Sequence, residues 1–274
     1  QNFALSGFGS LPPGDYPRIR ATFVNPNLLC SYLGIGLMLL PFMRSVDRAR
    51  RAWHAVVSAG AWTTALLSLS PGIGGLLLSR GIWEWRRRSK DSPRRVVAGV
   101  ALAAGIAAAV VFFAAALVDP ARADDGRLTL SAIQPSPRME MWRRSFHAFT
   151  GHPIVGQGIG TGAETFNYIA ASGEPQALTD AHNVWLSVAM QSGVLGLAAF
   201  IALIACAWRR SSPWVGDNHR VAGLKLALRC ALGATLFFQG LTGSFEEARH
   251  IWLVIGLMVC AGANESIQRQ TEAA

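Results

Sequence analysis

Asp180-Ala181-His182-Asn183 stands at the point where a long polar segment ends and an almost wholly apolar run, Val184 to Phe200, begins. A helix needs about 20 mostly apolar residues to cross a bilayer, and this run supplies most of one. His182 and Asn183 would cap the outer end of that helix, so that an imidazole lies where lipid-borne substrates meet water. The pattern indicates chemistry on a substrate held in a membrane.

Apolar segments recur along the whole chain. Of its 274 residues, 51% are hydrophobic and only 15% are charged, whereas an ordinary soluble domain carries about 25% charged residues. Segments with roughly the length of a bilayer crossing are Asn27–Met43, Trp53–Ser70, Gly72–Trp85, Val96–Val118, His182–Trp208, Val221–Leu241 and Ile251–Ala263. We therefore predict an all-α integral membrane protein with about seven transmembrane helices.

Residues 1–274 are expected to form a single membrane domain. The chain begins with Gln1, and no cleavable signal pattern precedes the first apolar run. The expectation is that the chain is the C-terminal part of a longer membrane protein, whose other helices contribute to the site.

The formal net charge is +9, a value that often indicates a nucleic-acid partner. Here the basic residues cluster in three alternate connections, at 44–51, 86–95 and 209–220. Alternate connections share one side of a membrane, and the positive-inside rule makes that side cytoplasmic. The charge therefore predicts topology and no nucleic-acid partner.

One connection, residues 119–181, is long and would lie outside the cytoplasm. A loop of about sixty residues in a compact protein is usually functional. Its middle predicts an amphipathic helix at the membrane surface, begun by Pro135 and Pro137 and ended by Gly151 and Pro153. The apolar stripe of that helix would be Met139, Trp142, Phe146 and Phe149.

A glycine-rich turn, His152 to Gly160, follows that helix. Gly156 and Gly158 permit positive φ and close backbone approach, which suits an anion cradle. Turns of this kind are also common as plain connectors, and the sequence leaves both interpretations open.

Neither a metal nor a cofactor is expected. No P-loop, GxGxxG or HExxH pattern occurs. The cysteines have no metal-type spacing, lie inside apolar segments and are expected to be buried as small hydrophobic residues; they are Cys30, Cys206, Cys230 and Cys260.

His182 is the first candidate for catalysis, because an imidazole can act as a general base at neutral pH and Asp180 lies close enough in sequence to orient it. The alternative is an interfacial packing residue. Arg138, at the start of the predicted surface helix, could hold a diphosphate in bidentate fashion. Arg143 and Arg144 are interpreted instead as interfacial arginines that extend toward lipid phosphates.

The segment before the first apolar run supplies the remaining candidates. Asn25-Pro26-Asn27 is a turn and cap signal, which alone explains both asparagines. Arg20 has no such explanation, because it is an outer-face arginine close to a membrane entry point.

Taken together, these segments resemble the O-antigen ligase and O-antigen polymerase superfamily of membrane glycosyltransferases. Four pieces in order carry the likeness: Arg20-Ala21-Thr22-Phe23-Val24-Asn25-Pro26-Asn27; Arg138 to Trp142 followed by His152-Pro153-Ile154-Val155-Gly156-Gln157-Gly158; His182-Asn183 with Gly193-x-x-Gly196 and Phe200; and Ile251-Trp252-Leu253. The family usually has Ser-Arg-Gly where this chain has Ser70-Pro71-Gly72. The work of that arginine would then fall to Arg138, to Arg20 or to a helix outside this chain, or the activity differs.

The resemblance implies a metal-independent, inverting glycosyl transfer at the outer face of a bacterial inner membrane. The donor would be a glycan on undecaprenyl diphosphate, and the acceptor a lipid, a glycan or a protein. His182 and Arg138 would be catalytic, and Arg20, Asn25, Asn27, Gly156, Gly158 and Asn183 would bind substrate. Two other classes stay open: a transporter, disfavoured by the scarcity of ionisable residues in the apolar segments, and an inactive scaffold of envelope assembly.

Overall fold

The computed structural model describes residues 26–43, 48–68, 70, 72–87, 93–117, 137–162, 165–169, 175–178, 181–213, 217–243, 245 and 248–273. Its elements, in chain order, are α1 (Pro26–Leu39), a 3₁₀ turn η1 (Leu40–Met43), α2 (Arg48–Leu67), α3 (Gly72–Arg87), α4 (Pro93–Leu117), α5 (Pro137–Gly151), β1 (Phe166–Ile169), β2 (Pro175–Leu178), α6 (Val184–Arg210), α7 (His219–Thr242) and α8 (Arg249–Ala273). Arg20, Asn25, Pro71 and Asp180 lie outside the described residues.

The helical architecture predicted from the sequence is confirmed. Each of the seven predicted apolar segments coincides with a helix, although α8 continues past the apolar segment to Ala273. The surface helix is α5, with the predicted start at Pro137 and end at Gly151. The antiparallel hairpin of β1 and β2, in which Phe166 pairs with Leu178, was not predicted. Its strands are too short to show a clear alternation of polar and apolar residues.

Among the described residues, only α6 is both long enough and apolar enough to cross a bilayer by length and composition. Shorter apolar helices lie at Asn27–Met43, Arg95–Ala107 and Arg249–Ala263. The seven crossings therefore stay a prediction.

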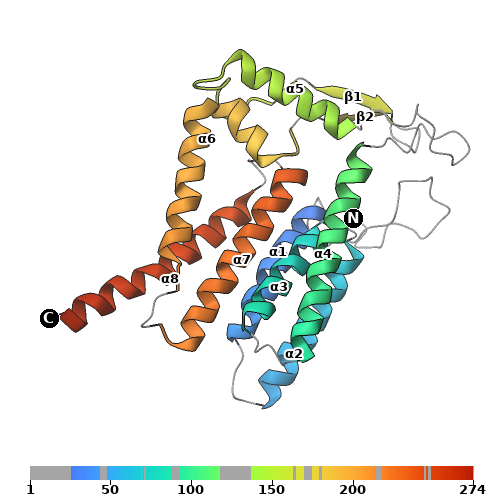
Figure 1. The fold of residues 1–274 in the computed structure, drawn as a ribbon. Helices are drawn as coiled ribbons and strands as arrows, with labels where there is room; N and C mark the ends of the chain where they lie inside the picture. Colours follow the sequence, from blue (N-terminus) through green and yellow to red (C-terminus); the bar gives the residue numbers. More distant parts are fainter. Residues whose placement is uncertain are drawn as a thin grey trace, which may run out of the picture.

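The helices are arranged with α5 and the hairpin at one end (Figure 1). The ends of α1, α3 and α6, and the starts of α2, α4 and α7, lie at the end of the bundle away from α5. These are the helix ends that flank the three basic connections. The arrangement is what the predicted topology requires, while the orientation in a membrane stays a prediction.

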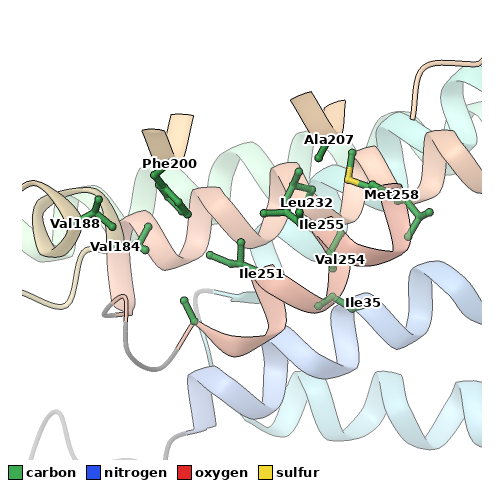
Figure 2. Packing of buried hydrophobic residues seen from close by; sticks show 12 residues of the cluster. Ile35, Val184, Val188, Phe200, Ala207, Leu232, Ile251, Val254, Ile255 and Met258 are labelled. Atoms are coloured by element: carbon green, nitrogen blue, oxygen red, sulfur yellow. The ribbon is translucent and has the colours of Figure 1, made fainter. Parts of the chain in front are cut away.

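The main core joins α6, α7 and α8 with one side of α1 (Figure 2). Val184 and Val254 are fully buried in it, and Ile35 is the contribution of α1. Two smaller clusters join α1 to α2 and α3, and α1 to α3 and α7. The core thus fixes the start of α6, where Val184 follows directly on Asn183.

α3 and α4 pack at very short range because glycines face the neighbouring backbone. A Cβ on Gly81 would lie 3.0 Å from the carbonyl oxygen of Ala98, and one on Gly105 would lie 2.6 Å from that of Gly74. Small residues at such contacts are typical of helix pairs in membranes.

The outward face of α4 is apolar: Val96, Val97 and Val100 are each more than 60% exposed. An exposed apolar helix face is what contact with lipid requires.

Two cysteines also lie on outward faces. Cys206 and Cys260 are exposed, so the prediction that all the cysteines are buried is wrong for these two. Both cysteines were predicted to be buried because their neighbours in the sequence are apolar, but these apolar residues lie at the surface of the bundle.

A buried ion pair closes the connection between α6 and α7. Lys225 is fully buried, and its Nζ lies 2.9 and 3.1 Å from the carboxylate oxygens of Asp217. Two charges removed from water in this way depend on each other, because either one alone would be desolvated without compensation.

Replacement of one partner of this pair should therefore destabilise the protein more than replacement of both. Lys225→Met or Asp217→Leu should lower the free energy of unfolding by about 3–5 kcal/mol, since an unpaired charge stays buried. The double variant should recover most of that loss. Denaturant unfolding in detergent, followed by circular dichroism, measures the difference. His147→Ala, which removes an exposed side chain of α5, is the control and should leave unfolding unchanged.

Candidate functional site

Asn183 caps the start of α6, as its position in the sequence predicts. Its backbone is extended, with φ −155° and ψ 110°, and its Oδ1 accepts hydrogen bonds from the N–H groups of Trp185 (3.0 Å) and Leu186 (3.2 Å). The cap satisfies two of the N–H groups that a helix start leaves without helical partners. With Oδ1 used in this way, the amide nitrogen is the part of the side chain that could contact a substrate.

His182, directly before the cap, has a left-handed backbone. Its φ is 44°, the only positive φ of a non-glycine residue among the described parts of the chain. This conformation costs free energy for a residue with a Cβ. Ala181 on one side and Val184 on the other are fully buried, whereas the side chain of His182 is partly exposed. The backbone is thus held from both sides and presents the imidazole at the protein surface.

α6 is sharply kinked at Gly193, which has φ 63° and ψ −165° (Figure 1). In a continuous helix the N–H groups of residues 194 and 195 would donate to the carbonyls of residues 190 and 191. Residues 153–158, which we name the kink segment, supply acceptors for these N–H groups and donors for these carbonyls. Val194 N donates to the Pro153 carbonyl (2.8 Å) and Leu195 N to the Ile154 carbonyl (3.3 Å).

The freed carbonyls of α6 find their donors in the same kink segment. Gln157 N donates to the Met190 carbonyl (2.9 Å), and Gly158 N donates to the Gln191 carbonyl (3.0 Å). Four backbone hydrogen bonds therefore replace the two that the kink removes. The N–H group of Gly158 is used here, which gives the glycine-rich turn a structural role of the connector type. Binding of substrate by Gly156 and Gly158 stays a prediction.

Glycine is required on both sides of this contact. Gly156 has φ 72°, and a Cβ there would overlap the backbone of Gln191 and Ser192. A Cβ on Gly193 would overlap the backbone of Ile154 and Val155. The two chains approach so closely that neither position has room for a side chain.

Aromatic rings fill the inner side of the kink. Trp185, before the kink, lies 5.7 Å from Phe200, after it, measured between ring centroids. Phe200 in turn contacts Phe245 (6.0 Å) and Trp252 (6.0 Å), in edge-to-face geometry. These contacts tie both limbs of α6 to the start of α8, and such pairs favour one geometry over others.

Ser187 and Gln191 form a polar pair inside α6 that was not predicted. Gln191 is buried; its Nε2 donates to Ser187 Oγ (3.0 Å), and its Oε1 accepts from Gly160 N (2.8 Å). Ser187 Oγ also accepts from Phe245 N (3.3 Å). The pair thus joins α6 to the glycine-rich turn and to the approach to α8. Two polar residues four apart in an otherwise apolar helix were the available signal.

The face of α5 that packs most closely on the protein lies beside the predicted stripe. The residues of α5 that are fully buried are Met141, which contacts Met190 of α6, and Ser145. Phe146, from the predicted stripe, is 56% exposed. Helical spacing alone could not tell the face that packs on α6 from a neighbouring apolar face. Met139, Trp142 and Phe149 are only partly exposed, and the location of this stripe at a membrane surface stays a prediction.

Glu140 on α5 holds two of the three arginines of this helix. Arg143 donates to both its carboxylate oxygens (2.7 and 2.8 Å), and Arg144 Nε donates to one of them (3.0 Å). Hydrogen bonding by Arg143 is the largest cause that lowers the pKa of Glu140, from 4.5 to about 2. Arg143 and Arg144 are therefore engaged with Glu140 within α5, and their contact with lipid phosphates stays a prediction.

Asn27 lies at the start of α1, away from the kink of α6. Its Oδ1 accepts from Ser70 Oγ (2.8 Å), and Ser70 Oγ accepts from Gly72 N (3.0 Å) at the start of α3. Ser70 thus connects the starts of α1 and α3. Because α1 begins at Pro26, Asn27 lies within the helix and not at the N-cap position predicted from the sequence. Binding of substrate by Asn27 stays a prediction.

His182 and Asn183 precede the first limb of α6, whereas Gly156 and Gly158 contact its other end at Gln191, about 12 Å along the helix from Asn183. Arg138 belongs to α5, which packs on α6, but its side chain is not among those described. Arg20 and Asn25 lie outside the described residues. Within the residues searched, no group of three or more His, Cys, Asp or Glu side chains is arranged to hold a metal ion.

These features define the class of the protein: a helical bundle with lipid-compatible outer faces and a surface helix at one end, above a kinked apolar helix. A family model described as O-Antigen ligase matches residues 55–201. This match covers more than half of the chain, so the chain belongs to the O-antigen ligase family, whose members are membrane proteins. It includes Arg138, the kink segment and His182, but not Arg20, Asn25 or Asn27. Comparison with curated proteins gives no match.

The kink should tolerate no side chain at its centre. Gly193→Ala should lower the thermal unfolding midpoint in detergent, because alanine at φ 63° is strained by about 1–2 kcal/mol and its Cβ also overlaps Ile154. Gly60→Ala on α2 is the control, since a Cβ there meets no atom within 4 Å. It should be neutral or stabilising by up to about 1 kcal/mol. Equal midpoints for the two variants would contradict this account of the kink.

The carboxyl group of Glu140 should titrate far below an ordinary glutamate. Its pKa of about 2 predicts a midpoint near that value when its carboxyl carbon is followed by NMR. Because the folded pKa lies below the unfolded one, the stabilising contribution is present above pH 4.5 and lost as the pH falls towards 2. Replacement of both Arg143 and Arg144 by Ala should raise the midpoint; a midpoint near 4.5 in the unaltered protein would rule out the cluster.

Proposed function

We propose that this protein transfers or polymerises a glycan carried on undecaprenyl diphosphate, without a metal, at the extracytoplasmic face of a bacterial inner membrane. Membership of the O-antigen ligase family supports a ligase- or polymerase-type glycosyltransferase acting on lipid-linked glycans and an acceptor. The particular donor, the membrane face and the roles of single residues are parts of the proposal.

The left-handed backbone of His182 is the observation that carries this proposal. Strained conformations persist only where the surroundings impose them, and they cluster at functional sites. Here the surroundings are the Asn183 cap and the buried Ala181 and Val184. If His182 were only a packing residue, its side chain would gain burial from this strain, yet the imidazole is partly exposed.

In the proposed reaction, His182 accepts the proton of an acceptor hydroxyl. The hydroxyl oxygen attacks the anomeric carbon of the donor sugar, and the bond from that carbon to the diphosphate oxygen breaks with inversion. The electron pair of the broken bond leaves with undecaprenyl diphosphate. The proton stays on the imidazole until it is released to water, so atoms and charge balance.

Arg138, together with Arg20, would stabilise the charge that gathers on the departing diphosphate. A guanidinium matches the geometry of phosphate oxygens in bidentate fashion. In a site with little water, fixed cations can fill the place of a metal, and loss of one such contact typically costs about 3 kcal/mol of barrier. The kink segment follows α5, which bears Arg138, and joins it to α6 by four backbone hydrogen bonds at residues 190–195.

His182→Ala should lower glycan transfer a hundredfold or more, because a positioned general base contributes about 10²–10⁴ in rate. His147→Ala is the matched control: His147 is an exposed histidine on α5, and its loss should leave transfer unchanged. Transfer is measured with purified protein, a lipid-linked glycan and an acceptor, after equal yields and unfolding midpoints have been established. Transfer by His182→Ala at the wild-type rate would overturn the proposal.

Ligase and polymerase differ in the acceptor, and the glycan profile of a deletion strain separates them. A ligase attaches glycan to lipid A core or to a protein, so its deletion removes all attached repeats. A polymerase extends another lipid-linked repeat, so its deletion leaves one repeat and removes long chains. An unchanged profile would favour an inactive scaffold.

A further inference from the structure

A groove of about 700 Å³ runs between α3 and α7, which pack side by side (Figure 1). Its lining includes His219 at the start of α7 and Arg86 at the end of α3, and Trp208 of α6 completes its wall. None of the residues assigned to glycan transfer lines it. The groove therefore needs an explanation separate from the proposed reaction.

One end of this groove is basic. Arg229 and Arg86 both line it, together with His219 at the start of α7. The guanidinium carbon of Arg229 lies 4.4 Å from the centre of a Trp208 ring, so the side chain is held in place by a cation–π contact. Two guanidinium groups that face one cavity favour an anionic occupant.

The Nε atom of Arg229 supports this interpretation independently. It is buried and has no hydrogen-bond partner among the residues that the structure describes. Lys225, one helical turn earlier on α7, is satisfied by Asp217. A buried donor without a partner costs free energy, and a ligand oxygen would satisfy it.

The rest of the groove is apolar and elongated. Along α7 the lining extends from His219 to Phe237, about 27 Å at about 1.5 Å per residue. Gly233 lies between them, and a Cβ added there would meet no atom within 4 Å. An apolar wall of this length suits a hydrocarbon chain. A free phosphate ion would not contact it.

We propose that the groove binds an anionic phospholipid, with its phosphate at Arg229 and Arg86 and an acyl chain along α7 past Gly233. The basic end coincides with the predicted cytoplasmic side, where anionic headgroups attract basic residues. A phospholipid is the occupant that combines a phosphate with a chain of this length. The proposal does not depend on the glycosyl-transfer reaction.

The test is lipid binding by the full chain in detergent, titrated with phosphatidylglycerol and followed by native mass spectrometry. Arg229→Met should weaken binding about tenfold or more, since it removes a charge-assisted hydrogen bond. Gly233→Phe should also weaken binding, because the ring fills the groove without removing any existing contact. Arg95→Ala is the matched control: Arg95 likewise lies over a tryptophan, Trp85, at 4.3 Å, but does not line the groove.

Wild-type affinity in both Arg229→Met and Gly233→Phe would overturn the proposal. So would equal affinity of the unaltered protein for phosphatidylcholine, or binding of inorganic phosphate as tight as that of phosphatidylglycerol. If the Arg229→Met variant does not fold, the test compares the lipid affinities of Arg229→Lys and Gly233→Phe. The lysine variant keeps the charge and should bind better than Gly233→Phe, and the reverse order would count against the proposal.

Discussion

The four backbone hydrogen bonds between the kink segment and α6 are the constraint on which the end of this protein nearest α5 depends. A helix that bends at Gly193 leaves two N–H groups and two carbonyls without helical partners, and buried backbone groups in that state are costly. Residues 153–158 satisfy all four. The first limb of α6 is thereby held under α5, and the second limb joins the core with α7 and α8. Without the kink, His182 would project along the axis of a straight helix, beyond the core that now anchors it.

The kink also explains why the site is made from segments far apart in the sequence. The kink segment follows α5 directly, so its bonds to α6 bring the end of α5 against the first limb of α6. Gln191 adds a side-chain bond to Gly160, and Ser187 adds one to Phe245. The connection between α5 and α6 is therefore tied at several points to α6 and to the approach to α8, which gives the backbone around the candidate site the rigidity that preorganised chemistry would require.

The positions of the helices could be predicted from the sequence, because apolar runs, prolines and glycines determine where a helix begins and ends through nearby residues alone. Pro137 and Gly151 bound α5 for this reason, and Asn183 is recognisable as a cap from its place before an apolar run. The face of α5 that packs on α6 could not be predicted, because the burial of Met141 depends on its contact with Met190, a residue of another helix. For the glycine-rich turn, the sequence could not decide between an anion cradle and a plain connector, because the deciding contact is again with α6. Its glycines are needed for a contact with residues some thirty-five positions away, and a contact of that range leaves no local pattern.

The extent of the family match bears on how the site should be understood. The match ends at residue 201, whereas the core that holds His182 in place continues beyond it. Val184 and Val188 pack against α7 and α8, and Phe200 contacts Trp252. The matched segment thus carries His182 and Arg138, and the following helices supply the surface against which α6 packs. A change in α7 or α8 that loosens this packing would act on the site through the backbone of His182, although neither helix contributes a residue assigned to the reaction.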